Sequence, residues 1–223
     1  VRALAPLGVH VQRRSPPFQE RHRVAGKPLG AFLIFRFARP SAKISNMMHA
    51  PDVIEVINAL GSASVDVWVH GGWGIDALLG EQTRAHDDLD VIIRADDVKA
   101  LIRVTRELGF AMMTDELPQV FVVRDAGNRR IDFHPVRFRS DGAAVQESNS
   151  GGEWVFSAPG LLGTGFIDGR KIRCLTPEEQ AMRAIDQPGE TAYEPDETDR
   201  RDMRLLRDRF GITFPYPFDD YQI

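Results

Sequence analysis

The chain of 223 residues contains very little cysteine and no long hydrophobic run. Its single cysteine, Cys174, excludes an internal disulfide and any zinc site built from several cysteines. The apolar run from Leu29 to Phe35 ends at Arg36, whereas a membrane-spanning helix needs about 20 apolar residues. We therefore expect no membrane partner and predict a location in the reducing cytoplasm.

Acidic residues are nearly missing from positions 1–46, which hold nine Lys or Arg and only Glu20, for a net charge of +8. Of the 28 basic and 32 acidic residues in the chain, 19 and 31 remain, so residues 47–223 carry a net charge of −12. Nucleic-acid binding depends chiefly on Lys and Arg at the phosphates, so we expect no nucleic-acid partner. A cationic small molecule would instead be attracted to the acidic region.

The first 46 residues also differ from the rest in pattern. They are rich in Arg and Pro, show no sustained helical or strand period, and end just before Met47 and Met48. Two interpretations remain open: an organelle-type targeting sequence, or an upstream extension read from an early start, with the functional chain beginning at one of these methionines. We divide the chain into this extension (1–46), a main domain (47–175) and a C-terminal helical segment packed on it (176–223).

Hydrophobic periodicity predicts an α/β fold in which a small mixed sheet is backed by helices and C-terminal helices close one side of a cleft. Gly109 is expected to end a helix in the left-handed conformation, Asp168-Gly169 predicts a tight hairpin, and Thr176 to Glu179 is typical of a capping box. The sequence has no Walker loop, Rossmann fingerprint or internal repeat. Helices are expected at 52–60, 73–79, 98–108, 177–186 and 196–210, the last with Met203, Leu206 and Phe210 as its apolar stripe. Strands are expected at 66–69, 88–93, 111–114, 120–124 and 130–136, with a loop over 147–152.

The segment from His70 to Asp90 joins a glycine turn, a short apolar helix and an Asp-x-Asp pair on a following strand. Alternation along that strand places the side chains of Asp88 and Asp90 on one face. Two adjacent carboxylates repel each other unless a cation or a shared proton compensates, and hard oxygen ligands of this kind suit Mg²⁺. Gly71 and Gly72 precede the helix, where backbone N–H groups can approach a polyphosphate closely.

A third acid, Asp132, lies on a later strand and shares a face with His134. Taken singly, these signals have ordinary structural interpretations: a Gly-Gly pair is most often a tight turn, and an acid on a strand is often solvated. Arg84 and His86 lie just before the first two carboxylates, where they would neutralise phosphates or would instead be a surface arginine and a capping histidine. The fixed order of all these residues favours a metal-dependent nucleotide site.

With these residues in this order, the chain resembles the polymerase-beta-like nucleotidyltransferase superfamily, and within it the aminoglycoside 2″-adenylyltransferases and lincosamide nucleotidyltransferases. The segments that carry the resemblance are Gly71-Gly72-Trp73-Gly74-Ile75-Asp76, Thr83-Arg84-x-His86-x-Asp88-x-Asp90 and Ile131-Asp132-Phe133-His134-Pro135. A looser similarity extends through Gly169 to Cys174 and Tyr193 to Pro195, so the resemblance covers most of residues 50–215. The superfamily usually has Gly-Ser where this chain has Gly72-Trp73, a departure that the antibiotic-modifying branch tolerates.

The resemblance implies a nucleotidyltransferase fold and transfer of a nucleoside monophosphate, AMP from ATP, to a hydroxyl of a small antibiotic. Two Mg²⁺ ions would be bridged by Asp88 and Asp90, one holding the triphosphate and the other orienting the attacking hydroxyl. Asp132 would complete the metal shell or take the proton from that hydroxyl. The residues expected at the nucleotide are Gly71, Gly72, Arg84 and His86.

The acceptor and three alternative functions stay open. An aminoglycoside needs acids around its amines, and the sequence offers Asp115, Glu116, Glu153, Glu190 and Glu194. A toxin-type nucleotidyltransferase acting on tRNA or protein would share the catalytic set, but a tRNA substrate would need a basic groove. A metal-dependent phosphohydrolase would use the same acids with water. A non-catalytic binding module is disfavoured, because adjacent acids are costly to retain without a metal.

Overall fold

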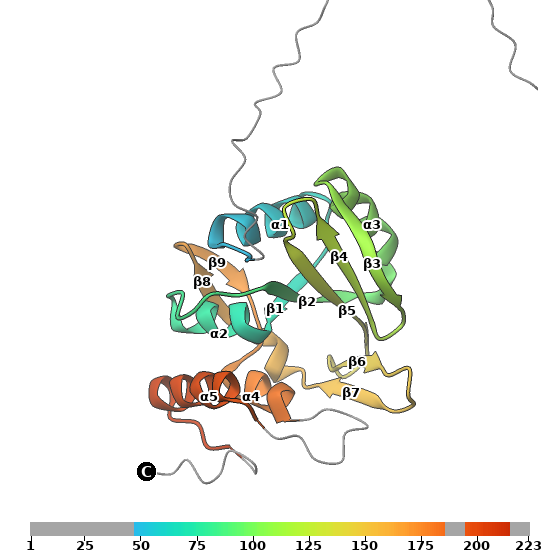
Figure 1. The fold of residues 1–223 in the computed structure, drawn as a ribbon. Helices are drawn as coiled ribbons and strands as arrows, with labels where there is room; N and C mark the ends of the chain where they lie inside the picture. The colour runs from blue at the N-terminus through green and yellow to red at the C-terminus, as the bar shows by residue number, and fades with distance from the viewer. Residues whose placement is uncertain (1–46, 186–194, 215–223) are drawn as a thin grey trace, which may run out of the picture. The chain divides into compact units, whose positions relative to one another are not determined.

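The computed structural model describes residues 47–185 and 195–214, whose helices and strands are shown in Figure 1. The expected N-terminal extension and two of the acids considered for acceptor binding, Glu190 and Glu194, lie outside the described residues. Within the described part of the chain, no helix combines the length and the apolar character that crossing a lipid bilayer requires.

One mixed sheet of seven strands forms the centre of the described domain (Figure 1). Five strands follow the order β1-β2-β5-β4-β3, and the hairpin β6-β7 extends β5. Strands β2 and β5 run parallel, and the other pairs in this sheet are antiparallel. The strands are β1 (Val67–His70), β2 (Asp88–Arg94), β3 (Phe110–Glu116), β4 (Val120–Asp125), β5 (Arg130–Phe138), β6 (Ala144–Glu147) and β7 (Glu153–Phe156). A separate hairpin pairs β8 (Thr164–Ile167) with β9 (Arg170–Arg173).

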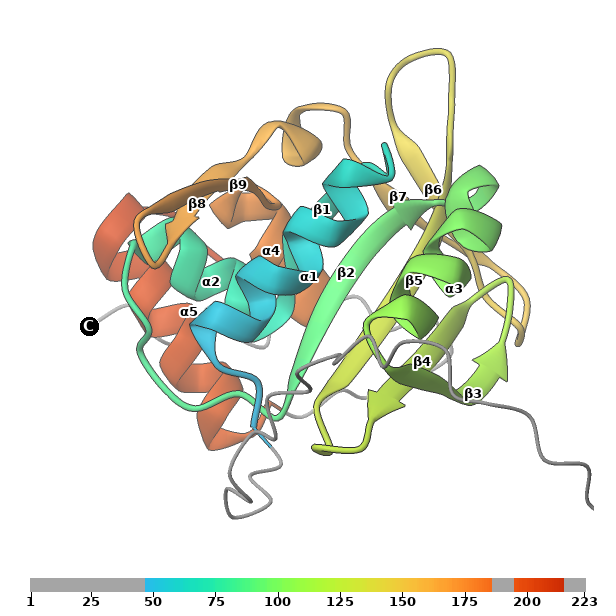
Figure 2. The same ribbon diagram turned by 90° about the horizontal axis from the view of Figure 1, so that it is seen from above.

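The described α-helices lie on both sides of the sheet. They are α1 (Ala50–Ser62), α2 (Gly71–Leu79), α3 (Val98–Glu107), α4 (Pro177–Ile185) and α5 (Glu197–Phe210). Figure 1 shows α1 and α3 on one side and α2, α4 and α5 on the other, and Figure 2 shows α1 and α3 from above the sheet. A small apolar cluster joins the second group of helices through Ile75 of α2, Ala181 of α4, and Met203 and Leu206 of α5.

Strand alternation gives the two faces of the sheet different roles. Leu89 and Val91 of β2 and Phe133 of β5 are fully buried and pack with Leu60 of α1 and Leu101 of α3 in the main core. This burial removes large apolar side chains from water, at about 25 cal/mol for each Å² of apolar surface. The same face of β2 therefore has no room for its acidic residues.

The opposite face of the central strands is divided along its length. At one end Trp68, Ile92 and Val136 belong to a second buried apolar cluster. At the other end the same strands carry Asp90 and Asp132, beside the start of α2. The sheet is therefore packed against an apolar cluster at one end and has a polar surface at the other.

The predicted α/β fold is confirmed, with element ends shifted by a few residues. Gly109 follows α3 at a φ of +91°, as expected for a left-handed helix end. In the β8-β9 turn, Asp168 and Gly169 have φ values of +49° and +72°, as a tight hairpin requires. The C-terminal helices close one side of a cavity beside the sheet, since α4 and α5 both line it.

Three local predictions need correction, whereas the loop expected over 147–152 is present as residues 148–152 at the tip of the β6-β7 hairpin. The two strands of this hairpin were not predicted, because four-residue strands are too short to show a reliable period. Helix α2 begins at Gly71 rather than at Trp73. The capping box is half-formed: Thr176 Oγ1 accepts the Glu179 N–H at 3.4 Å, but the Glu179 carboxylate accepts hydrogen bonds from Ser157. Phe210 is 38% exposed, so only Met203 and Leu206 form the buried stripe of α5.

Gly165 in β8 lies directly against the backbone of α2, where a Cβ would collide with Ala77 and Leu78. We expect Gly165→Ala to lower the free energy of unfolding by about 1–3 kcal/mol, because the hairpin must move away from the helix. Gly61→Ala in α1 is the matched control, because its added methyl group meets no atom within 4 Å. This control should raise stability by about 0.5–1 kcal/mol. Urea unfolding of both variants checks the pair, and equal effects would contradict the close packing of β8 on α2.

Candidate functional site

The register of three adjacent strands gathers the predicted acids. In the parallel pairing of β2 with β5, Asp90 lies opposite Asp132 and Asp88 lies opposite Arg130. In the antiparallel pairing of β1 with β2, His70 lies opposite Asp90. Side chains at paired positions share one face of a sheet. The structure therefore has all three acids on one face of the sheet, as predicted from the sequence.

The electrostatics of the three carboxylates differ. Burial and the neighbouring charges of Asp90 and Asp132 raise the pKa of Asp88 to about 6. Burial also raises the pKa of Asp132, although Arg130 opposes this shift by donating from Nε to Oδ1 at 2.7 Å. For Asp90, burial acts upward, but the hydrogen bond from His134 and the nearby Arg130 guanidinium bring the pKa of this carboxyl below its usual value. The carboxylates carry more negative charge than Arg130 alone offsets.

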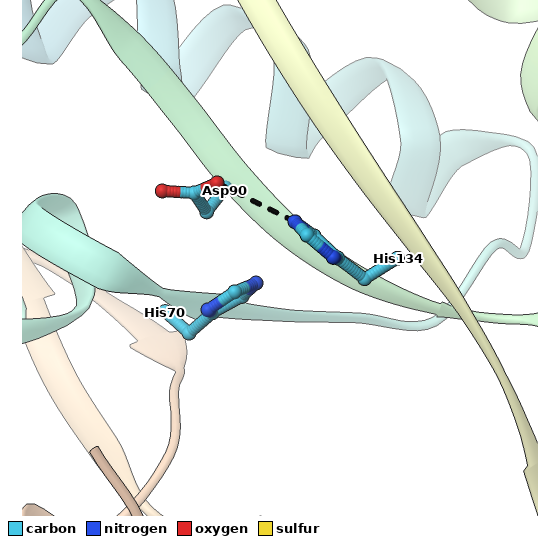
Figure 3. Close-up of side chains that lie close together, drawn as sticks. All are labelled: His70, Asp90 and His134. Atoms are coloured by element: carbon cyan, nitrogen blue, oxygen red, sulfur yellow. Dashed lines mark hydrogen bonds and ion pairs between the residues drawn. The ribbon is translucent and has the colours of Figure 1, made fainter. Parts of the chain in front are cut away.

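Two histidines flank Asp90 from neighbouring strands (Figure 3). His134 Nε2 lies 3.4 Å from Asp90 Oδ1, and the rings of His70 and His134 meet edge to face with centroids 4.7 Å apart. Burial lowers the pKa of His70 to about 3, so this ring is neutral at physiological pH. Its Nε2 atom is buried and has no hydrogen-bond partner among the described residues. His70, Asp90 and His134 each offer a ligand atom within 4.8 Å of the others.

The glycine turn is shaped by the side chains beneath it. Gly71 has a φ of +59°, and a Cβ there would collide with the Asp90 carboxylate. A Cβ at Gly72 would collide with the His86 ring and the Arg84 guanidinium. These glycines allow the start of α2 to lie directly on the polar face of β2. The sequence alone did not show that these glycines must lie so close to the side chains of Asp90, Arg84 and His86.

The structure places Arg84 and His86 differently from each other. Arg84 is 30% exposed and pairs with Asp202 of α5, with its Nη2 3.0 Å from Oδ2. His86 is only 3% exposed and lies below the turn, with Nε2 bonded to Asp76 and its ring against Trp73. Only Arg84 of the two therefore faces solvent beside the turn.

A cavity of about 440 Å³ opens between the polar end of the sheet and helices α4 and α5. Its walls include Asp90 and Trp154 from the strands, Arg84 beside the turn, and Gln180 and Asp202 from the helices. A larger cavity of about 790 Å³ lies between α1 and β9, but none of the three carboxylates lines it. We therefore take the smaller cavity as the candidate site, because it is lined by Asp90.

Several polar residues of this cavity were not among the predicted site residues, including His70, Gln146, Gln180 and Asp202. His70 directly precedes the glycine turn, which was its only sequence signal. Gln146 lies on the undetected strand β6, and Gln180 and Asp202 lie on helices whose periodicity marked only their apolar sides. The Gln180 Nε2 atom is buried and has no hydrogen-bond partner among the described residues.

The family model that describes aminoglycoside-2″-adenylyltransferases matches residues 52–206. The chain belongs to the aminoglycoside-2″-adenylyltransferase family. This family membership confirms the resemblance inferred from the motifs. It also shows that the protein is a nucleotidyltransferase.

The relatives of this family member include enzymes for two antibiotic classes. A lincosamide resistance protein of Staphylococcus haemolyticus is 26% identical over 163 residues, which cover 73% of this chain and 97% of that protein. A 2″-aminoglycoside nucleotidyltransferase of Klebsiella pneumoniae is 30% identical over 120 residues, which cover 54% of this chain and 63% of that protein.

Solved structures of relatives share the fold. A lincomycin-bound lincosamide antibiotic adenylyltransferase has a TM-score of 0.62 at 25% identity, over 72% of this chain and 98% of that one. ANT(2″)-Ia in complex with adenylyl-2″-tobramycin has a TM-score of 0.55 at 23% identity, over 72% of this chain and 88% of that one. The second comparison supports the fold alone.

The crowding of the carboxylates predicts a pH-dependent stability difference for Asp88→Asn in EDTA. At about pH 7.5 the variant should melt a few degrees above the wild-type protein, because it removes a negative charge from the buried group. A raised folded-state pKa contributes stability that is present below the unfolded value and lost as pH rises through the folded one, here about 6. The difference should therefore shrink below about pH 6 and vanish near the unfolded value of about 4.

Thermal melting from about pH 4 to 8 measures this difference. Asp115→Asn, at an exposed position of β3, is the control and should melt like the wild-type protein. Added Mg²⁺ should raise the melting temperature of the wild-type protein more than that of Asp88→Asn. An Asp88→Asn variant less stable than the wild-type protein at every pH would contradict the crowding.

Proposed function

We propose that this protein transfers AMP from Mg²⁺–ATP to a hydroxyl group of an aminoglycoside or lincosamide antibiotic. The observation that carries the proposal is the convergence of Asp88, Asp90 and Asp132 on one sheet face beside the 440 Å³ cavity. The adenylyltransferase names of the family and of the lincomycin-bound relative support AMP as the transferred group, and the lincosamide resistance protein and the 2″-aminoglycoside nucleotidyltransferase support the class of acceptor.

The oxygen chemistry of the three carboxylates suits a divalent cation, although the described side chains whose ligand atoms lie within 4.8 Å of one another are those of His70, Asp90 and His134. Burial, and after it the charges of Asp90 and Asp132, raise the pKa of Asp88, so a nearby cation would relieve repulsion that Arg130 leaves uncompensated. Oxygen ligands of this kind suit Mg²⁺, which commonly retains substrate phosphates and waters in its remaining positions. When bound there, Mg²⁺ would neutralise the triphosphate and the charge that develops on departing pyrophosphate.

The chain's own residues supply the proton transfer. The acceptor hydroxyl oxygen forms a bond to the α-phosphorus while the bond from that phosphorus to the bridging oxygen breaks, and pyrophosphate leaves. The hydroxyl proton passes to a carboxylate oxygen of Asp132. Burial strengthens Asp132 as a base by raising its pKa, and Arg130 fixes the orientation of this carboxylate.

Donors around the cavity suit the triphosphate tail. The backbone of Gly71 and Gly72 begins α2, where helix N–H groups favour anions. Arg84 adds a guanidinium that lines the cavity, and Gln180 adds a buried amide. His86 supports this wall from below rather than contacting the nucleotide, because Asp76 and Trp73 enclose its ring.

Two acids of α5 line the cavity and suit contact with an amine of the antibiotic. Asp115, Glu116 and Glu153 are exposed and do not line the cavity, whereas Asp199 and Asp202 of α5 do. The Asp202 carboxylate also holds Arg84, and the Asp199 carboxylate also accepts the Asp196 N–H.

The decisive test is incubation with each NTP, Mg²⁺ and a panel that includes lincomycin and tobramycin, followed by mass spectrometry. We expect one antibiotic to gain the mass of AMP, with equimolar pyrophosphate and no product in EDTA. Release of phosphate without an acceptor would instead identify a phosphohydrolase. Label on tRNA or protein but on no antibiotic would identify a toxin-type transferase.

The role of Asp132 as a base predicts a specific kinetic change. Asp132→Asn should lower kcat by about 10²–10⁴ and leave the affinity for Mg²⁺–ATP within a few-fold, because proton transfer is what disappears. Steady-state rates and calorimetric binding measure the two quantities, with Asp115→Asn as the control. A matching loss of Mg²⁺–ATP affinity would show that Asp132 is a metal ligand. Unchanged rate and affinity would show that Asp132 does not belong to the site.

A further inference from the structure

His134 lies beside the carboxylates, and its two ring nitrogens have different neighbours. Nε2 lies 3.4 Å from Asp90 Oδ1, and Figure 3 shows this contact with the His70 ring beside it. Nδ1 lies 3.1 Å from Nε2 of Gln146. A neutral imidazole carries its proton on one nitrogen only, so the location of that proton decides whether His134 donates a hydrogen bond or accepts one at Asp90.

The side-chain amide of Gln146 settles this location. Its Nε2 atom lies 2.6 Å from the backbone carbonyl oxygen of Gln119, in the turn between β3 and β4. A carbonyl oxygen only accepts hydrogen bonds, so the amide group facing it must be NH₂ rather than oxygen. The same NH₂ group faces His134 Nδ1, which must therefore be the acceptor.

We infer that Gln146 fixes His134 as the neutral tautomer protonated on Nε2, so that His134 donates to Asp90 and holds this carboxylate in place. His134 is then a positioning residue in one chain of hydrogen bonds: the Gln146 amide donates to the Gln119 carbonyl and to the His134 ring, and the His134 ring donates to Asp90. Only the expected effect on catalysis rests on the proposed function. The tautomer itself is a property of the folded protein.

The fixed tautomer also chooses between two kinds of metal ligation. His70, Asp90 and His134 together resemble the set of two imidazoles and one carboxylate that suits transition metals. A protonated Nε2 has no free electron pair for a metal, and Nδ1 is occupied by Gln146. His134 is therefore excluded as a ligand, which leaves a carboxylate site of the kind that Mg²⁺ prefers.

Nitrogen NMR of the full chain labelled with ¹⁵N-histidine tests the tautomer directly. In EDTA at about pH 8, we expect the His134 signals of a single tautomer with the proton on Nε2. Assignment comes from the signals that disappear in His134→Gln. Gln146→Leu removes the donor and should move the His134 signals towards a mixture of tautomers. A wild-type His134 protonated on Nδ1, or averaging between tautomers, would overturn the inference.

Kinetics test the consequence for Asp90. Partners that orient a ligating carboxylate typically contribute 10–100-fold to metal affinity or activity, so we expect Gln146→Leu to weaken Mg²⁺ activation by roughly that factor. Asn58→Leu is the matched control, because Asn58 lies on α1, which packs on the opposite face of the sheet. Equal Mg²⁺ dependence in Gln146→Leu, Asn58→Leu and the wild-type protein would contradict the positioning role.

Cobalt binding tests the exclusion of His134 as a ligand. The visible absorption of Co²⁺ reports on its ligands, and we expect His134→Gln to keep the spectrum of the wild-type protein at saturating Co²⁺, with an affinity lowered by about 10–100-fold because Asp90 is no longer held in place. Loss of the spectrum in this variant would show that His134 binds metal and would overturn the inference. Transfer of no nucleotide, together with an Nε2-protonated His134, would contradict the proposed function while the tautomer stands.

Discussion

The placement of Asp90 opposite Asp132 across the parallel strands β2 and β5 is the constraint on which the rest of the site depends. Two acids at paired positions repel each other, and Asp88 on the same face adds to the repulsion. The fold tolerates this arrangement because the other side of each strand packs in the main core. Arg130 compensates part of the charge, His134 donates a hydrogen bond to Asp90, and the remaining negative charge favours a cation. Without a cation, this repulsion is expected to lower the stability of the fold.

A second network keeps the turn and the C-terminal helices in register with these acids. Asp76 accepts hydrogen bonds from the backbone and the hydroxyl of Thr83 and is bonded to His86. Arg84, the residue after Thr83, reaches Asp202 of α5. Because Asp202 is nearly buried, removing Arg84 would leave an uncompensated buried charge. The cavity therefore has one wall fixed by strand pairing and another fixed by this network.

The sequence predicted the parts of the site that depend on local periodicity. Alternation placed Asp88 and Asp90 on one face, and the glycine turn and its helix followed from their neighbours. It did not predict contacts that depend on pairing between distant segments. The burial of His86 below Gly72 and the position of Gln146 at His134 arise only when the strands and the turn are assembled.

Calorimetric titration with a non-hydrolysable ATP analogue, in which a methylene group joins the α- and β-phosphorus atoms, tests the central claim most directly. If Asp88, Asp90 and Asp132 form the metal-dependent nucleotide site, the analogue should bind the wild-type protein in Mg²⁺ and lose most of its affinity in EDTA. Asp90→Asn should lose the same affinity in Mg²⁺, whereas Asp115→Asn should bind like the wild-type protein. Equal affinity in Mg²⁺ and EDTA, or full affinity in Asp90→Asn, would contradict the account.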